Sequence, residues 1–446
     1  MKSTEVVPQR GNGELISIVS QHLQGNEHLV VAYSGGIDST VLLHLLVCLR
    51  QRNPALTLRA IHIHHGLNPA ADQWVTHCQQ RCLAWQVPFQ TISVVVKSAH
   101  KGIEAGAREA RYAALKQALK PDEIVVTAQH IDDQCETLLL ALKRGSGPAG
   151  LSAMPVETAF SSGKHLRPLL SVSRQQIEEW ASEHQLSWID DDSNDDQRYD
   201  RNFLRQAVLP PLMRRWPEFA ANCARSAALC AEQEQLIDEL LADSLSALID
   251  DEGALTFTAL TSLSEPHRNA LLRRWITKNR GMMPSRVALQ HLWQEVACSR
   301  QDATPCFRYG DAEVRRYRQR LYWLPRQQPE PFTDSLHWPS PWLPLLIPGN
   351  RGCVMISSQG DLLRRPREDE QVSVRFNIQG HFRLAGRTGS RALKKIWQEL
   401  AVPPWRRAAI PMLFYDEVLI AALGVFVTID GTSQGEDDWQ VHWNQE

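Results

Sequence analysis

The sequence predicts an α/β protein that begins with a doubly wound parallel sheet. Between about residues 28 and 130, apolar β-runs alternate with amphipathic stretches, and this alternation is typical of parallel strands joined by crossover helices. The glycine-rich segment Ser34-Gly35-Gly36-Ile37-Asp38-Ser39 follows the first run directly. Ligands of such folds bind beyond the carboxyl ends of the strands, which is where this segment falls. A helical domain and a small α+β domain are predicted to follow.

The predicted strands of this sheet are short runs rich in apolar and β-branched residues. They cover Leu29–Tyr33, Leu58–His64, Phe89–Val96 and Glu123–Ala128. Amphipathic helices are predicted between them, near residues 39–51, 71–86 and 104–119.

The rest of the chain changes in texture. Residues 173–245 and a second unit to about 300 look helical, and we expect three tryptophans to anchor the packing of the first unit: Trp180, Trp188 and Trp216. The proline-rich stretch Pro325–Phe332 indicates a linker. Beyond it, short β-runs at Val354–Ser357 and Val418–Val427 surround one helix. We therefore predict domains over 1–225, 226–328 and 340–446.

Size and composition narrow the class of protein. At 446 residues the chain exceeds one core, and a formal net charge of −2 means that any nucleic-acid surface must come from a local patch. Nine scattered cysteines favour reduced thiols in a cytosolic compartment. Cys78 and Cys82 could form half of a metal site, but no second pair answers them. Without a signal-type or membrane-length apolar run, we expect a soluble, cytoplasmic protein with no membrane association.

The segment Ser34–Ser39 has the residues of an anion-binding turn. Gly35 and Gly36 would let the backbone approach an anion, and the following helix would point unpaired N–H groups at it. Ser34 and Ser39 add hydroxyls, and the Asp38 carboxylate suits a Mg²⁺ ion carried on phosphates. No Gly-Lys-Ser/Thr end is present, so this is not a Walker loop. The alternative is an ordinary Ser/Gly turn.

A second group of polar residues follows the fourth predicted strand. His130 lies at the strand end, and Asp133 and Glu136 are three residues apart on one face of the next helix. Paired carboxylates with an imidazole suit metal binding, ammonium recognition and proton removal. A plain helix cap would need only one carboxylate.

Several cationic residues could contact phosphate. Arg108 and Arg111 lie with Tyr112 on the third helix, and Arg201 and Arg205 share one helical face behind the acidic run Asp190–Asp196. Solvated helix faces and helix capping are the alternatives. Lys143 and Arg144 end a helix before a glycine loop, where they could cap the helix or contact a nucleic-acid backbone.

Near the C-terminus, basic residues outnumber acidic ones and tryptophans are interleaved with them. The basic residues are Arg383, Arg387, Arg391, Lys394, Lys395, Arg406 and Arg407, against Glu399 alone. This pattern favours binding to an RNA backbone over a solvated face balanced by acids elsewhere. His62, His64 and His65 lack a matching Cys or carboxylate partner, so strand-end structure or a nucleotide contact is favoured over a metal site.

Taken together, these segments resemble bacterial tRNA(Ile)-lysidine synthases, a family of the N-type ATP pyrophosphatase (PP-loop) superfamily. The matching segments are Ser34–Ser39, Ile61–Leu67, Glu104–Tyr112, Gln129–Leu151, Arg167–Leu170, Asp192–Asn194, Arg201–Arg205, Val372–Arg375 and Lys394–Pro404. One departure is Gln129, where many members carry a histidine before the residue equivalent to His130.

The resemblance implies a fold like that of the adenine nucleotide alpha hydrolases, with residues 1–225 catalytic and the later domains binding tRNA. It implies that ATP adenylates the C2 oxygen of the wobble cytidine in an isoleucine tRNA with anticodon CAU. The ε-amine of free L-lysine would then displace AMP, which changes codon reading from AUG to AUA and identity from methionine to isoleucine. ATP and Mg²⁺ would be the cofactors, and no obligate protein partner is evident.

The resemblance also implies roles for the candidate residues. Ser34, Gly35, Gly36, Ile37, Asp38 and Ser39 would hold pyrophosphate, with Asp38 also placing Mg²⁺. Arg108 and Arg111 would stabilise adenylyl transfer, and His130, Asp133 and Glu136 would orient lysine or metal and assist proton removal. Arg201, Asn202 and Arg205 would close the site on phosphate or nucleotide. The expected tRNA contacts are Lys143, Arg144, Asn202, Arg383, Arg387, Lys394, Lys395, Arg406 and Arg407.

Three other functions compete with this hypothesis. A tRNA thiolase of the same superfamily would need reactive cysteines, often as a Cys-x-x-Cys pair, which this chain lacks. An amidotransferase-type synthetase would need a glutaminase domain, for which no nucleophile segment is apparent. A non-catalytic tRNA-binding protein with a dead nucleotide fold should have lost Asp38, Asp133 or the arginines, yet all are present.

Overall fold

A computed structural model describes residues 12–23, 25–66, 68–96, 103–190, 196–300, 303, 305–326, 335–349, 351–433, 435 and 438–444. The chain divides into two compact units, Met1–Leu240 and Leu241–Glu446. The Asp192–Asn194 motif and residues 327–332 of the expected linker lie outside the described residues. Within the described residues, no helix is long and apolar enough to cross a membrane.

The first unit is built on a six-stranded sheet with the order β3-β2-β1-β4-β6-β5. Its strands are β1 (His28–Ala32), β2 (Thr57–His64), β3 (Phe89–Ser93), β4 (Ile124–Val126), β5 (Glu157–Phe160) and β6 (Gly163–Leu166). All neighbouring strands are parallel except β5 and β6, which form an antiparallel hairpin at one edge. The four predicted strands and the doubly wound sheet are confirmed, and the hairpin is an addition.

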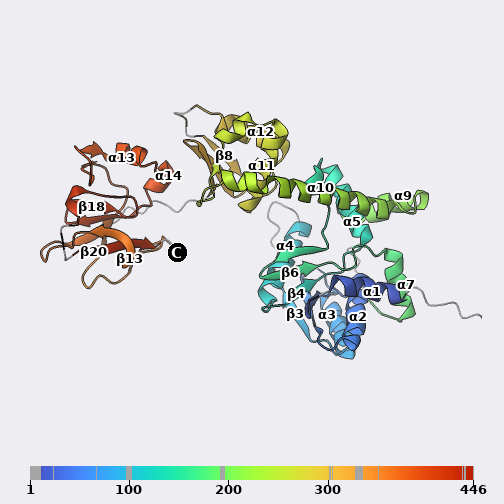
Figure 1. Cartoon of the computed structure of the whole chain (residues 1–446). Coiled ribbons are helices and arrows are strands. Elements are labelled where there is room, and N and C mark those ends of the chain that lie inside the picture. Colours follow the sequence, from blue (N-terminus) through green and yellow to red (C-terminus); the bar gives the residue numbers. More distant parts are fainter. Residues whose placement is uncertain are drawn as a thin grey trace, which may run out of the picture. The chain divides into compact units, whose positions relative to one another are not determined.

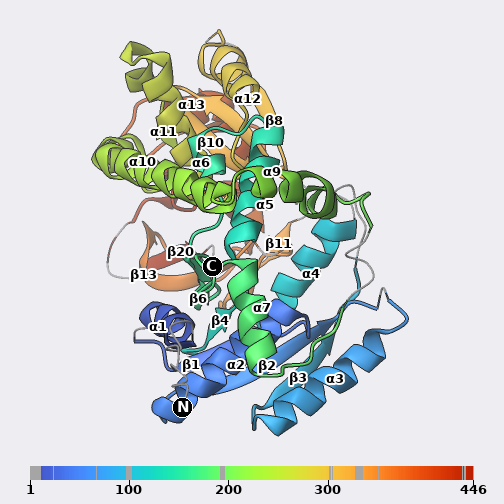
Figure 2. The same ribbon diagram turned by 90° about the vertical axis from the view of Figure 1, so that its right-hand side faces the viewer.

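Helices cover both faces of this sheet. They are α1 (Asn12–His22), α2 (Ile37–Arg52), α3 (Ala71–Ala84), α4 (Ile103–Ala118) and α7 (Arg174–Glu183). Two further helices, α5 (Ile131–Lys143) and α6 (Pro148–Leu151), contribute instead to a separate apolar cluster with Leu209, Ala220 and Cys223. One core lies between the sheet and α1, α2, α3 and α7, and a smaller one lies on the opposite face under α4. Figure 2 shows α4 on the other side of the strands from α2 and α3. Because both faces are covered, the central strands β1 and β4 consist almost entirely of apolar residues.

The segment after α7 is helical, as expected. It comprises α8 (Asp200–Phe203), the π-helical turn η2 (Leu204–Val208), α9 (Leu209–Arg215) and α10 (Phe219–Leu248), the long helix seen in Figure 1. The expectation that three tryptophans anchor this region was wrong for two of them. Trp180 is buried, whereas Trp188 and Trp216 are 37% and 53% exposed. Instead, the indole N–H of Trp188 donates a hydrogen bond to the Asp190 carboxylate at the surface.

The description of residues 226–328 as helical was incomplete. Helices α11 (Glu265–Lys278) and α12 (Arg286–His291), with the 3₁₀ turn η3 (Thr258–Ser262) and the π-helical turn η4 (Leu292–Ala297), pack on a four-stranded sheet. Its strands are β7 (Leu255–Thr256), β8 (Cys306–Tyr309), β9 (Ala312–Tyr317) and β10 (Arg320–Pro325). The strands are short and carry several arginines on their exposed positions, so they lack a long apolar run.

The C-terminal part is an α+β module, as predicted. Its strands are β11 (Leu336–His337), β12 (Leu345–Leu346), β13 (Cys353–Leu363), β14 (Val372–Arg375), β15 (His381–Phe382), β16 (Arg391–Ala392), β17 (Met412–Tyr415), β18 (Val418–Ala422), β19 (Phe426–Val427) and β20 (Trp439–Asn444). Two short helices, α13 (Leu393–Glu399) and α14 (Pro404–Arg407), and the 3₁₀ turn η5 (Ile429–Gly431) complete it. Two apolar clusters form its core.

Candidate active site

The turn after β1 leaves the start of α2 open to a ligand. Gly36 is the N-cap of α2, and no side chain caps the helix there. Ser34 and Ser39 bond each other through their hydroxyls at 3.0 Å, so both lie at this turn. Gly35 has a φ of +90°, and a Cβ there would come within 2.8 Å of the Cys78 sulfur. Unpaired N–H groups, hydroxyls and a glycine approach together make an anion site.

Asp38 on the first turn of α2 joins this turn to two other elements. Its Oδ1 accepts a hydrogen bond from Arg174 Nη1 at 2.7 Å, and His130 Nε2 lies 3.8 Å from the same oxygen. Arg174 begins α7, and His130 precedes α5. The parallel strands β1 and β4 are neighbours, which brings their carboxyl ends together.

His130 and Asp133 form a capping box at the start of α5. The His130 backbone N–H donates to Asp133 Oδ2 at 3.0 Å, and the His130 ring accepts from the Asp132 N–H. The capping alternative is therefore part of the structure. However, Asp133 Oδ2 also lies 3.6 Å from His130 Nε2, and its Oδ1 accepts from Arg205 at 3.2 Å. Asp133 therefore does more than cap.

Glu136 is fully buried and holds Arg205. Arg205 donates to its carboxylate from Nε at 2.8 Å and from Nη2 at 3.1 Å. Burial raises the pKa of Glu136 above the ordinary carboxyl value, and Arg205 opposes that rise. Arg205 lies in the π-helical turn η2, and such turns often occur at functional sites. Two carboxylates that already hold one cationic side chain can hold an ammonium group.

Arg111 and Arg201 bring positive charge to this centre. Crowding by protein atoms lowers the pKa of Arg111, and the nearby charges of Arg108 and Arg201 lower it further, although the Arg111 side chain keeps much of its surface exposed. Arg201 also acts on Glu136 electrostatically. Arg108 stacks over Tyr112, with 5.1 Å to the ring centroid. Arginines that repel one another yet stay solvent-accessible are suited to a polyanion.

A buried row of polar side chains lies beside this centre. Thr127, His165 and Arg167 are all less than a tenth exposed. His165 bonds Thr127 through Nε2 at 2.7 Å and Arg167 through Nδ1 at 3.1 Å, and Thr127 in turn donates to Gln129. The row runs from β6 to the end of β4, the strand that leads into His130.

The expected tRNA-binding residues of the first unit lie at two helix ends. Lys143, in the last turn of α5, forms an exposed ion pair with Asp200 at 2.7 Å. Arg144 is the C-cap of α5 and Gly145 follows it with a φ of +67°, so the capping alternative holds for the backbone here. Asn202 donates to the Asp196 carbonyl.

The basic residues near the C-terminus divide into two groups. Arg387 and Arg391 both pair with Glu399, Arg406 pairs with Glu252 at 2.6 Å, and Arg407 donates to the Val402 carbonyl. Within the described part of the chain, no ion pair engages Arg407, Arg383, Lys394 or Lys395. Lys394 and Lys395 are exposed on α13. The intact patch is therefore smaller than the sequence suggested.

His62, His64 and His65 do not form a metal centre. Among the described residues, no group of three or more His, Cys, Asp or Glu side chains could hold a metal ion. His62 bonds the Tyr33 carbonyl at 3.0 Å and lies 3.7 Å from the Cys78 sulfur, so it ties β2 to the end of β1. Burial and the nearby Arg111 charge lower the pKa of His65 to about 4.

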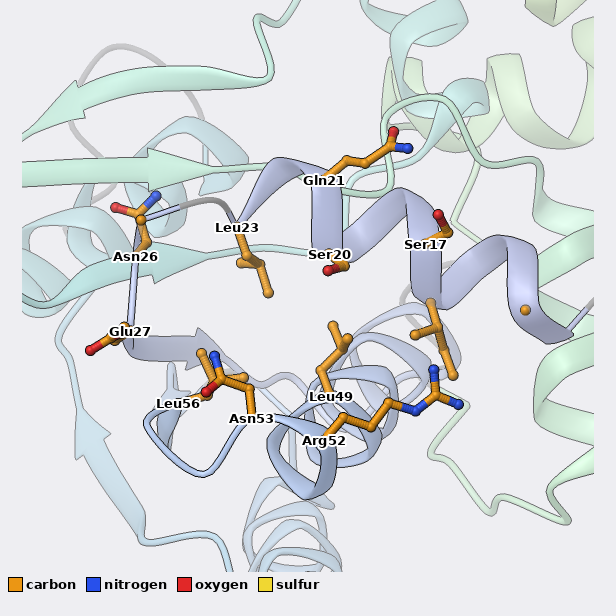
Figure 3. A pocket seen from close by; sticks show the side chains of 13 residues that line it. Ser17, Ser20, Gln21, Leu23, Asn26, Glu27, Leu49, Arg52, Asn53 and Leu56 are labelled. Carbon is orange, nitrogen blue, oxygen red and sulfur yellow. The ribbon is translucent and has the colours of Figure 1, made fainter.

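A cavity of about 540 Å³ lies near the amino ends of β1 and β2, whereas this centre lies at the carboxyl ends of the strands. Ser17 and Ser20 of α1 line it with Asn26, before β1, and Arg52 at the end of α2 (Figure 3). No candidate residue from the sequence lines it. The charged groups gather instead at the carboxyl ends of β1 and β4, which makes that centre the candidate active site.

Sequence reasoning missed two parts of this centre. Arg174 follows the helix-capping residue Ser173 and carries no local motif, so only the fold reveals that it reaches Asp38. His165 lies on strand β6, which was not predicted, and Arg167 directly follows that strand. The segment Arg167-Pro168-Leu169-Leu170 is among those that resemble the family, so it could have indicated these residues, but no function was predicted for it.

Comparisons with known proteins agree along most of the chain. Family models match residues 11–212 as "PP-loop domain", 255–322 as "TilS substrate binding domain" and 372–443 as "TilS substrate C-terminal domain". The tRNA(Ile)-lysidine synthase of Serratia proteamaculans is 54% identical, covering 97% of this chain and 99% of that protein. That of Salmonella typhimurium is 53% identical, covering 95% and 98%. Among solved structures, the U34-tRNA thiolase NcsA of Methanococcus maripaludis aligns over 49% of this chain and 79% of that chain, with 15% identity and a TM-score of 0.43, too low to carry an argument.

Proposed function

Because the chain belongs to the tRNA(Ile)-lysidine synthase family, we propose that it joins free L-lysine to C2 of the wobble cytidine of an isoleucine tRNA with anticodon CAU. ATP drives the reaction, and AMP and pyrophosphate leave. The observation that carries this proposal is the group Asp38, His130, Asp133 and Glu136, which the fold gathers beside an uncapped helix start.

The C2 carbonyl of cytidine is a poor electrophile, so the first step converts its oxygen into a leaving group. The cytidine C2 oxygen attacks the α-phosphorus of ATP, a bond forms between them, and the bond to the β-phosphate oxygen breaks. The open N–H groups of α2 and the hydroxyls of Ser34 and Ser39 would hold the departing pyrophosphate. Arg111 and Arg201 would neutralise charge at the α-phosphate.

The residues present fit a Mg²⁺ ion brought in with ATP. Magnesium binds through one or two carboxylates together with phosphate oxygens, and Asp38 is a partly exposed carboxylate beside the anion turn. Asp38 would hold the ion, which would supply charge neutralisation at the phosphates. Arg174 pairs with Asp38 and so occupies the carboxylate that this role requires.

The second step consumes lysine. Its ε-amine has an ordinary pKa of about 10.4, so it arrives protonated and must lose a proton before it attacks C2. Asp133 and Glu136 would receive the ammonium in place of the Arg205 guanidinium that they now hold. The raised pKa of Glu136 suits it to accept the proton. The amine then bonds to C2 and the C2–oxygen bond breaks, so that AMP leaves with the former C2 oxygen.

The experiment that tests this function incubates the protein with ATP, Mg²⁺, radiolabelled lysine and an unmodified isoleucine tRNA bearing CAU. A methionine tRNA with the same anticodon is the matched control. We expect the label to become fixed to the isoleucine tRNA alone. Pyrophosphate release without fixed lysine would keep adenylation and reject lysine as the nucleophile. No pyrophosphate release with either RNA would favour the non-catalytic alternative.

A further inference from the structure

The row formed by the buried residues Arg167, His165 and Thr127 and the half-buried Gln129 has no part in the steps above. Its position is fixed by the sheet, because β4 and β6 are parallel neighbours with Val126 opposite Leu166. Thr127 and Arg167 therefore extend side by side beyond the paired positions. Tyr112 and Phe160 cover the His165 ring from outside, with ring centroids 5.6 and 5.9 Å away. The row is thus held on several sides.

The direction of each hydrogen bond in this row follows from the chemistry of its members. A guanidinium has no lone pair to offer, so Arg167 Nη2 must donate and His165 Nδ1 must accept. Burial, with the nearby charges of Arg167 and Arg108, lowers the pKa of His165 to about 3, so the ring is neutral near pH 7. Its one proton therefore lies on Nε2, which donates to Thr127 Oγ1.

The direction at His165 fixes the direction at the next two residues. The Thr127 hydroxyl accepts from His165, and its single proton is donated to Gln129 Oε1. Gln129 Oε1 is therefore held as an acceptor, which leaves the Nε2 amide on the other side as a donor. No hydrogen bond to Gln129 Nε2 occurs within the described residues. Gln129 directly precedes His130, the N-cap of α5, so its backbone lies at the carboxyl end of β4 beside the candidate site.

We propose that the row Arg167–His165–Thr127 locks the Gln129 amide so that Nε2 donates a hydrogen bond to an acceptor oxygen of the bound nucleotides during adenylyl transfer. The acceptor is either the cytidine C2 oxygen or an α-phosphate oxygen, which share this chemistry. Gln129 would contact the substrate, and Thr127, His165 and Arg167 are positioning residues. The inference rests on the proposed function, whose reaction supplies the oxygen.

Fixing the orientation of the Gln129 amide gives the three buried side chains a function in catalysis. The side-chain amide of an unrestrained glutamine can flip, so that its oxygen takes the place of its nitrogen. The amide oxygen would then repel the substrate oxygen. A donor fixed in advance stabilises charge that develops in the transition state without reorganising at that moment. The network also satisfies its own buried polar atoms, so a purely structural role is the outcome that the test must separate.

A double-mutant cycle between Thr127 and Gln129 provides this test. Thr127→Val keeps the shape and removes the hydroxyl, and we expect it to lower kcat for lysidine formation about tenfold. Thr127→Ser restores the hydroxyl and should stay within about twofold of the original protein. In a Gln129→Ala background, Thr127→Val should have no further effect, because its target is gone. The inference is overturned if the losses in kcat of the two single variants multiply in the double variant. It is also overturned if Thr127→Val has the kcat of the original protein.

Further arms keep the test decisive. Thermal unfolding shows whether Thr127→Val is folded. If it is not, Gln129→Glu is used instead, because it removes only the amide donor, and full activity of that variant overturns the proposal. Weaker binding of a non-hydrolysable ATP analogue to Gln129→Ala assigns the donor to the phosphate, and weaker tRNA binding assigns it to the base; either supports the proposal. The unaltered protein must fix lysine in the same assay. If it does not, the proposed function fails, separately from the role of Gln129.

Discussion

At the residue scale, the centre is organised by the pairing of each carboxylate with a cation. Asp38 holds Arg174, and Asp133 and Glu136 hold Arg205. A carboxylate whose charge is already balanced can exchange one cation for another at little electrostatic cost. Substrate ammonium and Mg²⁺ are therefore suited to replace these arginines.

Replacing Asp133 by asparagine tests the ammonium role. The change keeps the size of the side chain and removes its charge, so lysine should bind poorly, and we expect lysidine formation to fall at least 100-fold. Affinity for tRNA, measured by filter binding, should change less than about twofold, because the proposed phosphate contacts to RNA lie elsewhere. Glu157→Gln, on the exposed edge strand β5, is the matched control and should be active. Full activity of Asp133→Asn would remove Asp133 from the catalytic set.

Single residues were predictable from the sequence where a motif brought them together locally. Ser34–Ser39 and His130–Glu136 each lie on one strand–helix junction, so spacing alone indicated that the polar groups of each segment lie together. The partner of Asp38 was not predictable in this way. Arg174 lies 136 positions away and meets Asp38 only because α7 packs near α2.

At the scale of an element, the turn between β1 and α2 depends on one glycine more than on the other. Gly35 has a positive φ, and a Cβ there would come within 2.6 Å of Ile189 Cδ1. Gly36 has an ordinary φ of −71°, and a Cβ there would meet nothing closer than 3.7 Å. The left-handed conformation is therefore required at the first position only.

The two alanine variants of this turn should differ in stability. We expect Gly35→Ala to lower the free energy of unfolding by about 1–3 kcal/mol, from strained backbone and overpacking. Gly36→Ala should leave the unfolding free energy nearly unchanged, so any loss of ATP binding there would reflect the anion site itself. Denaturant unfolding of both variants measures the difference. Equal stability of the two would contradict the conformation of the turn.

The hairpin β5–β6 and the sheet of the middle segment show why some elements escaped prediction. β5 and β6 are four residues each and are joined by a two-residue loop at Ser161 and Ser162. β6 pairs with β4, and β5 pairs only with β6. Strands that short have too few residues for a periodic signal. Tertiary pairing, which local sequence does not report, decides their conformation.

In the C-terminal module, an ion pair beside β14 makes stability depend on pH. Arg364 donates twice to Glu370 at 2.7 Å, and both side chains are 15% exposed. These bonds lower the pKa of Glu370 in the folded state. The stabilisation is therefore present above the ordinary carboxyl pKa and is lost as the pH falls through the folded value.

Glu370→Gln should reveal this dependence. At pH 7 we expect the variant to unfold about 1–3 kcal/mol more easily, and the difference should shrink as the pH falls below about 4. Glu417→Gln is a matched control, because Glu417 pairs with Arg375 but is 85% exposed and should contribute little. Thermal unfolding at several pH values measures both. A difference that grows in acid would contradict the sign.

At the scale of the whole molecule, the domain order was predictable, and the basic surface only in part. Composition and the proline-rich stretch indicated an α/β part followed by further domains, and the compact units divide at Leu240 and Leu241, within α10. The predicted domain boundaries stay predictions. Counting basic residues did not reveal that Glu252, from a distant part of the sequence, pairs with Arg406, and the tRNA contacts of these residues stay predictions.

The remaining cations should carry the contact to RNA. Replacing Lys394 and Lys395 by alanine should weaken tRNA binding, and the slope of log affinity against log salt should flatten by up to about 1.5. Arg406→Ala should have a smaller effect, because its charge is already paired with Glu252. Binding at several salt concentrations distinguishes the variants. A slope unchanged in the double variant would exclude α13 from the RNA surface.

We propose that one centre both activates a tRNA oxygen and receives an amine. ATP labelled at the α-phosphate, in a single turnover with isoleucine tRNA bearing CAU and no lysine, tests both halves of this proposal. We expect the label to move to the tRNA and added lysine then to release it as AMP. If the label never reaches the tRNA, or stays there after lysine is added, the proposal is wrong.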